Sequence, residues 1–255
     1  MIIDTSMPNH AARHRKMLEA TEPGPIRYVI LTHGHGDHTG GVRLWMQPGT
    51  KLIAQKKFVD FRDYQNRLAG FYAGRNASQF GLPQLGVARA ASQTAAIEPD
   101  ILVDEKFDLA LGGVRFEMHH TPGETYDHLT VWIPEWKVAF PGDNIYGSFP
   151  NIYTLRGTQP RWALDYVVSL EKVASWKPEN LLPSHGRPER GVEHIQRAIL
   201  KYVGAIRHVH DATVRGMNEG KDVFTLMKEV RLPKEFEIGE GYGNLPWSVR
   251  GIYEG

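Results

Sequence analysis

The residues best suited to chemistry in this sequence form one dense cluster near the N-terminus. Four side chains that can bind a metal ion lie within six residues: His33, His35, Asp37 and His38. In an extended loop, His33 and His35 project to one side and can chelate one ion, while Asp37 and His38 turn back to face a second. The glycines between them allow a tight backbone path and keep bulk out of the site. A mixed set of nitrogen and oxygen ligands suits Zn²⁺, and also Mn²⁺ or Fe²⁺.

A histidine-rich exposed loop is the alternative interpretation of this cluster. A lone histidine would favour that interpretation, but the spacing H-x-H-x-D-H does not. The cluster also follows directly on a short apolar run, residues 27–32 (RYVILT), which is typical of a buried parallel strand. The sequence therefore predicts a metal site at the end of a strand.

The composition of the chain limits the kind of protein that holds this site. The chain has 255 residues, 41% hydrophobic and 23% charged, which is the mixture of an ordinary globular protein able to bury a large core. A formal net charge of +1 gives no broad basic surface for nucleic acid or anionic lipid. The chain has no cysteine, so His, Asp or Glu must hold any metal.

The start of the chain and its apolar runs bear on its location. The first ten residues, MIIDTSMPNH, lack the basic and apolar segments of a secretory signal. No apolar run approaches the roughly 18 residues that a membrane helix requires. We expect a soluble protein without a membrane span, and a cytoplasmic one if the chain start is native.

Strand-like and helix-like segments alternate along the chain, which indicates an α/β layered sheet. Helices are expected at residues 8–20, 161–175 and from 192 onward, and the start of another is expected at 42–45. Short strands are expected at 27–32, 51–54, 114–119, 129–133, 137–140 and 180–183, with a hairpin turn at 134–136. Residues 58–92 are the least regular stretch, and their aromatic residues suggest a partly buried insertion.

The H-x-H-x-D-H motif resembles the signature of the metallo-β-lactamase superfamily, whose fold is an αββα sandwich with the site at one edge of two sheets. Three later segments are also similar to that family: residues 121–125 (TPGET), 140–144 (FPGDN) and 183–186 (PSHG). The resemblance implies two divalent ions, expected to be zinc, with Asp143 bridging them and Asp37 and Asp143 at the reacting centre. The implied ligands are His33, His35, Asp37, His38, Glu124, Asp143 and His185.

The third ligand of the first ion has two candidates. Glu124 stands where the family commonly has the histidine of T-P-G-H-T, and His128 follows four residues later. From an extended loop either side chain can reach the ion. The resemblance favours Glu124, which leaves His128 to support the ligands or to face the substrate. Asp127, Thr32 and Ser184 are candidates for orienting the ligands.

A carboxylate at that position is a feature of the alkyl sulfatase branch of the family. Residues 151–157 (NIYTLRG) are similar to that branch's H-N-x-Y-T-L-R-G segment, in which the arginine contacts sulfate, and residues 69–81 and 207–220 are similar to other parts of it. The resemblance implies substrate contacts by Arg156, Asn151 and Tyr153, and an alkyl sulfate as the small-molecule substrate. Asp143 where the branch usually has Glu, and Pro150 where it has His, are departures from its pattern.

The predicted architecture is a metallo-β-lactamase-like catalytic domain over residues 1–190, followed by a helical segment over 191–255. The second part is similar to the dimerisation region of the alkyl sulfatases, which implies a homodimer. Two other functions remain open. One is hydrolysis of another ester, a lactone, a thioester or a β-lactam on the same fold. The other is a non-catalytic dimerisation or scaffold protein that retains the fold, although degenerate members of that kind generally lose ligands that this chain keeps.

Overall fold

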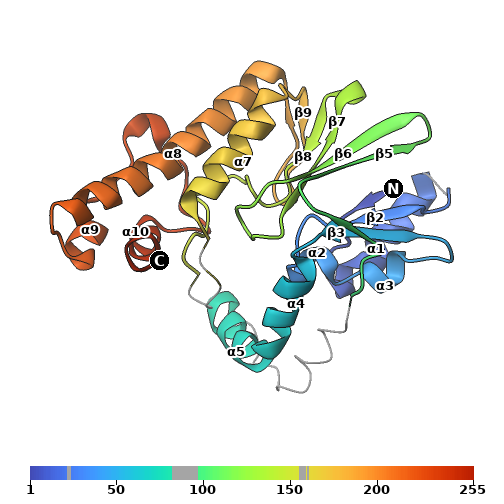
Figure 1. The fold of residues 1–255 in the computed structure, drawn as a ribbon, viewed down its shortest axis with the longest axis horizontal. Coiled ribbons are helices and arrows are strands. Elements are labelled where there is room, and N and C mark those ends of the chain that lie inside the picture. Colours follow the sequence, from blue (N-terminus) through green and yellow to red (C-terminus); the bar gives the residue numbers. More distant parts are fainter. Residues whose placement is uncertain (22–23, 82–96, 155–158, 160) are drawn as a thin grey trace. The chain divides into compact units, whose positions relative to one another are not determined.

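The computed structural model describes residues 1–21, 24–81, 97–154, 159 and 161–255 (Figure 1). The chain divides into two compact units. The first unit comprises Met1–Phe107, Met118–His120 and Asp127–Leu129. The second unit comprises Asp108–Glu117, Thr121–Tyr126 and Thr130–Gly255.

The first unit is built on a four-stranded parallel sheet. Its strands follow sequence order: β1 (Ile2–Ile3), β2 (Tyr28–Ile30), β3 (Lys51–Gln55) and β4 (Ile101–Val103). Parallel strands need long crossover connections. Helix α1 (Pro8–Thr21) lies between β1 and β2, and helices α2 (Gly36–Thr39) and α3 (Val42–Trp45) lie between β2 and β3. The predicted alternation of strands and helices is confirmed here.

The core of the first unit forms where α3 and the start of the helix that begins at Phe58 pack on β2 and β3. The strands are near-continuous runs of buried apolar residues, as parallel strands require. The buried cluster contains Ile26, Val29, Leu31, Val42, Trp45, Leu52, Ala54 and Phe58. This packing fixes the end of β2, from which the histidine-rich loop departs.

The stretch that looked irregular in sequence begins with two helices, α4 (Phe58–Arg67) and α5 (Ala69–Phe80). Phe58 and Phe61 are buried one turn apart on α4, whereas Phe71 on α5 is 53% exposed. Gly70 and Gly74 lower helix propensity and weaken the pattern in sequence. Helix α5 ends at Gly81, which adopts the left-handed conformation with φ 61°. Residues 82–92 of the predicted insertion lie outside the described residues.

The six-stranded sheet has the order β10-β9-β8-β7-β6-β5. Its strands are β5 (Lys106–Leu111), β6 (Val114–His120), β7 (Leu129–Ile133), β8 (Val138–Phe140), β9 (Asn180–Leu181) and β10 (Glu189–Arg190). The predicted hairpin is confirmed: β7 and β8 are antiparallel, and Lys137 in the left-handed region completes the turn between them. Strands β8 and β9 run parallel, so the loops after them leave the same edge.

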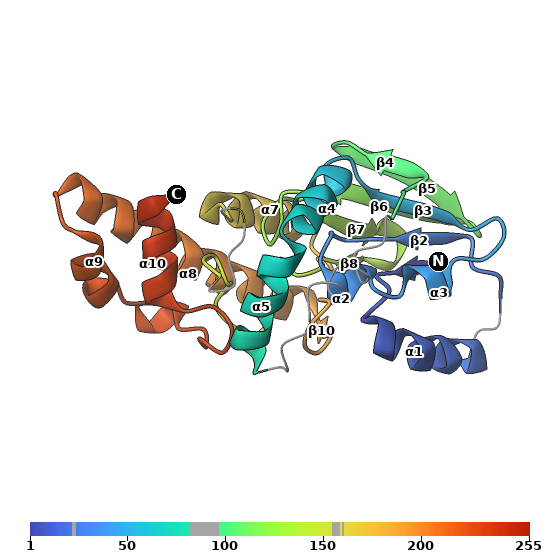
Figure 2. The same ribbon diagram turned by 90° about the horizontal axis from the view of Figure 1, so that it is seen from below.

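Among the described residues, four α-helices complete the second unit: α7 (Ala163–Ser175), α8 (Val192–Asn218), α9 (Val223–Glu229) and α10 (Leu245–Glu254). Helix α7 lies along α8, and α10 lies beside α9 (Figures 1 and 2). Helix α8 buries one face at helical spacing, with Ile195, Ile199, Tyr202 and Ile206 in the core.

The helices after Gly191 share one hydrophobic core with α7 and with strand residues such as Trp132, Ala139 and Leu181. A division into separate domains at residue 190 stays a prediction. Among the helices of the described residues, none is both long and apolar enough to cross a membrane.

Candidate metal centre

The loop after β2 carries the histidine-rich motif in a tight path. The backbone N–H of Leu31, just after β2, donates to the carbonyl of Ile53 at 2.9 Å. Helix α2 begins only five residues later, at Gly36. Gly34 lies against the ring of Phe61, where a Cβ atom would collide with Cδ1 of that ring. A side chain at this position would therefore displace the loop. His33 and His38 are buried at the two ends of this path.

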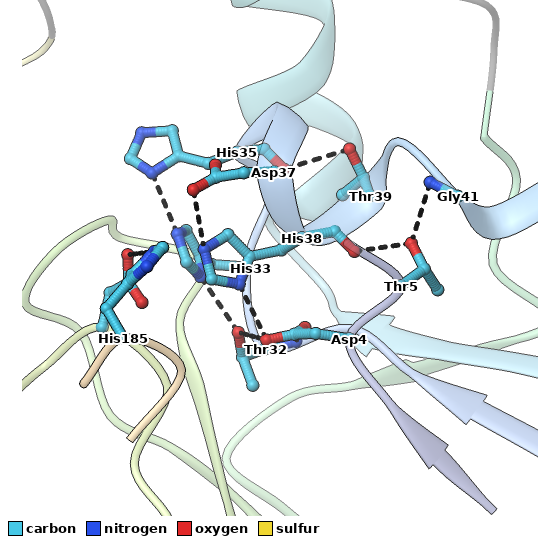
Figure 3. A network of polar contacts seen from close by, with 11 residues as sticks. Asp4, Thr5, Thr32, His33, His35, Asp37, His38, Thr39, Gly41 and His185 are labelled. Carbon is cyan, nitrogen blue, oxygen red and sulfur yellow. Dashed lines mark hydrogen bonds and ion pairs between the residues drawn. The ribbon is translucent and has the colours of Figure 1, made fainter. Parts of the chain in front are cut away.

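Three imidazole rings of the first unit converge (Figure 3). The ring centroid of His33 lies 4.7 Å from that of His35 and 4.1 Å from that of His38. His33 Nε2 faces His35 Nδ1 at 2.9 Å. At this separation the two nitrogens share a proton, or both can turn their lone pairs to one cation. The arrangement is that of a chelating pair.

Asp4 fixes the tautomers of two of these histidines. Its Oδ2 atom accepts hydrogen bonds from His38 Nδ1 at 2.8 Å and from the Thr32 hydroxyl at 2.8 Å. Because that hydroxyl has given its one proton to Asp4, its oxygen accepts from His33 Nδ1 at 3.0 Å. Both histidines are then protonated on Nδ1 and present an Nε2 lone pair, which is the form that binds a metal ion.

Asp4 was not among the residues predicted from sequence, whereas Thr32 was a candidate for orienting the ligands. A signal for Asp4 was present: it directly follows β1, and Ile3 of that strand pairs in parallel with Ile30 of β2. Residues just after neighbouring parallel strands meet at one edge of the sheet. An acid at that position lies next to the loop that follows β2.

Replacing Asp4 by asparagine is expected to weaken zinc binding about 10- to 100-fold, because the amide has one acceptor oxygen where Asp4 uses two, for the backbone N–H of Thr32 and for His38 Nδ1. Either the His38 ring or the loop that carries Thr32 would then lose its acceptor. Competition with a chromogenic chelator measures the affinity. Asp104→Asn, which removes a 70% exposed carboxylate of the same unit, should leave it unchanged. Equal affinities of the Asp4 variant and the unchanged chain would contradict the assigned role.

Asp37 lies on the exposed side of the same loop. Its Oδ2 atom is 3.5 Å from His38 Nε2, and its side chain is 41% exposed. A carboxylate oxygen and an imidazole nitrogen at this separation can bind one ion together. Asp37 and His38 thus form a second pair of possible donors beside His33 and His35, and their assignment as metal ligands stays a prediction.

His128 belongs to the same unit and is fully buried. The backbone N–H of Leu129 donates to the carbonyl of Thr32 at 2.7 Å, which anchors this segment beside the end of β2. The His128 ring stacks on that of His33 with 5.2 Å between centroids. His128, the alternative candidate for the third ligand of the first ion, therefore lies beside His33.

Arg62 of α4 supports the loop from its other side. Its Nη1 atom donates to the carbonyl of Gly34 at 3.1 Å. Burial lowers the pKa of this guanidinium, and the charge of Asp127 opposes that shift. Asp127, a candidate for orienting the ligands, is buried with an oxygen 3.2 Å from the Cβ position of Gly34. Arg62 and Asp127 are therefore charges of opposite sign at the histidine-rich loop.

In the second unit, Asp143 and His185 lie together. Asp143 follows β8 and His185 follows β9, and these parallel strands release their loops at the same edge. Ser184 donates its backbone N–H to the carbonyl of Gly142 at 3.1 Å, which joins the two loops. His185 Nε2 is 3.4 Å from Asp143 Oδ2. These two predicted ligands thus also form a pair of donors.

Glu124 is placed differently from the other predicted ligands. Its Oε2 atom lies 2.5 Å from Arg161 Nη1 and accepts a hydrogen bond from the Tyr166 hydroxyl at 2.6 Å. The side chains of Glu124 and Arg161 are 1% and 2% exposed. Arg161 was not predicted from sequence. The carboxylate charge is thus already balanced by a partner of the second unit.

Of the predicted substrate contacts, Asn151 and Tyr153 are described and Arg156 lies outside the described residues. The backbone N–H of Asn151 donates to the Tyr146 hydroxyl at 3.0 Å, and its carbonyl accepts from Arg161 at 3.0 Å. The guanidinium of Arg250 lies over the Tyr153 ring, 5.9 Å from its centroid. The segment of Asn151 and Tyr153 is therefore held by the second unit itself.

A family model described as the metallo-beta-lactamase superfamily matches residues 1–185. The chain belongs to this superfamily. The recognition made from the H-x-H-x-D-H motif is thereby confirmed, and so is the α/β fold class that it implied.

Named relatives of this superfamily member include alkylsulfatases. The linear primary-alkylsulfatase of a Pseudomonas species is 29% identical over 255 residues, covering 91% of this chain and 48% of that protein. The alkyl/aryl-sulfatase BDS1 of Saccharomyces cerevisiae is 27% identical, covering 100% of this chain and 44% of that protein. The chain therefore spans less than half the length of these two relatives.

Solved structures of the same superfamily show the same fold. The stereoselective inverting sec-alkylsulfatase Pisa1 from Pseudomonas sp. matches 99% of this chain and 45% of its own, with a TM-score of 0.87 at 22% identity. A metallo-beta-lactamase family protein from Thermus thermophilus matches 99% of this chain and 82% of its own, with a TM-score of 0.67 at 19% identity. Likeness at these identities supports the fold and leaves the reaction to be argued from the residues.

Proposed function

We propose that this chain is a dinuclear zinc hydrolase that cleaves alkyl sulfate esters to an alcohol and sulfate. The observation that carries the metal part is the convergence of His33, His35 and His38 with tautomers fixed through Asp4. A mixed nitrogen and oxygen donor set without thiolates suits zinc. The substrate class rests on similarity to two alkylsulfatases.

We assign the ligands from the donor pairs within each unit. In the first unit, His33, His35 and His128 would hold one ion, and Asp37 with His38 would hold another. The donor pair of the second unit, Asp143 and His185, would complete the ligand set that the family resemblance implies. His128 takes the place expected for Glu124, because the Glu124 carboxylate already has Arg161 and Tyr166 as partners.

The residues would divide the work of hydrolysis as follows. His33, His35, Asp37 and His38 would hold zinc, which when bound would lower the pKa of a water molecule towards neutrality and so supply a nucleophile at neutral pH. Asp4 keeps the Nδ1 proton of His38 in place throughout, so that this ligand does not change tautomer. Arg156 offers a planar guanidinium that matches two sulfate oxygens, with Asn151 and Tyr153 beside it in sequence. Water adds and the ester bond breaks, which gives the alcohol and hydrogen sulfate.

Apolar groups on the surface suit an alkyl chain and a second copy of the protein. Helices α4 and α5 expose part of Tyr64 and Phe71, and we assign this aromatic stretch to the alkyl chain.

Helices α7, α8 and α9 expose Val168, Leu200 and Phe224 at 58–65%. The homodimer through the second unit rests on the resemblance of residues 191–255 to the dimerisation region of the alkyl sulfatases, and these exposed side chains are available to it.

The substrate assignment is tested by incubating the zinc-loaded full chain with dodecyl sulfate. We expect sulfate and dodecanol to appear in equal amounts, measured by ion chromatography and gas chromatography. A panel of one lactone, one thioester and one β-lactam serves as comparison. Hydrolysis of a panel member without sulfate release would move the function to that substrate class. A chain that binds no zinc and hydrolyses nothing would instead favour the scaffold function.

A further inference from the structure

A buried ion pair in the second unit has no part in the proposed chemistry. Glu124 Oε2 and Arg161 Nη1 are 2.5 Å apart, and both side chains are almost fully buried. The Tyr166 hydroxyl donates to the same carboxylate oxygen at 2.6 Å. Leaving either charge buried without its partner is strongly unfavourable, so each depends on the other.

The buried groups around Glu124 and Arg161 make the two charges strongly dependent on each other. Burial, and then the negative charge of Glu124, raise the pKa of Tyr166 well above its usual value, so that its hydroxyl stays neutral. Burial lowers the pKa of Arg161, but the charge of Glu124 and the nearby tyrosines, Tyr166 first among them, together outweigh this, and the net shift is upward. Among the described residues, Arg161 Nε and Nη2 have no hydrogen-bond partner. Glu124 and the Asn151 carbonyl are therefore the acceptors that hold this guanidinium.

The pair is linked by hydrogen bonds to the loop of Asp143. The backbone N–H of Glu124 donates to Asn144 Oδ1 at 3.0 Å, and Asn144 Nδ2 donates to the carbonyl of Thr121 at 2.7 Å. A Cβ atom at Gly123 would collide with Asn144 Oδ1, so the two segments are closely packed. Asn144 is the residue next to Asp143.

The pair is linked on its other side to the segment of Asn151. Arg161 Nη1 donates both to Glu124 and to the carbonyl of Asn151, at 3.0 Å for the latter. The Tyr146 hydroxyl accepts from the backbone N–H of Asn151 at 3.0 Å. One guanidinium thus joins the segment that precedes Asp143 in the chain to the segment that follows it.

We propose that Glu124 and Arg161 are positioning residues, whose ion pair holds the Asp143 loop and the Asn151 segment in place, and that Arg161 rather than a metal ion balances the charge of Glu124. The pair itself is independent of the proposed function. Only its effect on metal binding through Asp143 rests on that function.

The first test uses metal-free protein, prepared with a chelator, and compares Glu124→Gln, Arg161→Met and the double variant. Each single variant is expected to lower Tm by about 10 °C, because it leaves one buried charge unpaired. The double variant is expected to lose less than the sum of the two. Glu179→Gln breaks an exposed pair of 2.6 Å with Lys137 in the same unit and should shift Tm by less than about 3 °C.

The second test measures zinc binding well below Tm. Glu124→Gln is expected to bind as many ions as the unchanged chain, but about 10- to 100-fold more weakly, because the Asp143 loop is less well held. A variant with unchanged metal-free Tm that has lost one ion would overturn the proposal and make Glu124 a ligand. If the single variants do not fold, the double variant decides: a double variant no more stable than they are would also overturn it. The metal-free Tm needs neither zinc nor substrate, so it separates this proposal from the proposed function.

Discussion

Replacing Asp37 by alanine is expected to remove one of the two zinc ions and to lower kcat/KM for dodecyl sulfate by roughly 10³-fold. The estimate follows because a catalytic metal ion supplies several kcal/mol of stabilisation and each 1.36 kcal/mol is a factor of ten. Asp37 Oδ2 lies 3.5 Å from His38 Nε2, the pair assigned to the second ion. Elemental analysis and initial rates measure the two effects.

The exposure of Asp37 makes this variant informative. Its side chain is 41% exposed, so its removal should leave Tm of the metal-free protein nearly unchanged. Asp60→Ala, which removes an exposed carboxylate of α4, is the matched control and should retain both ions and full activity. An Asp37 variant that keeps two ions and the rate of the unchanged chain would contradict the ligand assignment.

Replacing His128 by alanine is expected to have a comparable effect at the other ion. The variant should bind about one zinc ion per chain and lose activity to a similar extent, because His128 is the buried imidazole stacked on His33. Titration with zinc, followed by elemental analysis of the dialysed protein, measures the stoichiometry.

His120→Ala is the control for this variant. His120 is also a buried histidine of the first unit, but its Nδ1 atom lies 3.4 Å from the Glu105 carboxylate. A general cost of removing a buried imidazole affects both variants, whereas loss of an ion is expected only for His128→Ala. The assignment fails if His128→Ala keeps two ions with unchanged affinity.

Much of the fold could be predicted from local patterns. The apolar runs at 27–32 and 129–133 became β2 and β7, because buried strands show their burial directly in composition. Helix α8 could be predicted from its apolar spacing. Helices α4 and α5 were missed because glycines and mixed polar residues obscure their short buried faces.

For the candidate site, the spacing of His33, His35, Asp37 and His38 within one loop was enough to single them out as candidate ligands, and their role as ligands stays a prediction. Asp4 follows β1 and His38 lies in the helix after β2, so their hydrogen bond joins the ends of two neighbouring strands. Sequence spacing does not show that contact. Arg161 was missed for the same reason, because nothing in the local sequence shows that a distant guanidinium pairs with Glu124.

The central claim is tested most directly by the zinc content of the full chain. We predict about two zinc ions per chain after dialysis, lost to a strong chelator together with hydrolytic activity and recovered when zinc is returned. A folded chain that binds no zinc at micromolar concentrations would contradict the account.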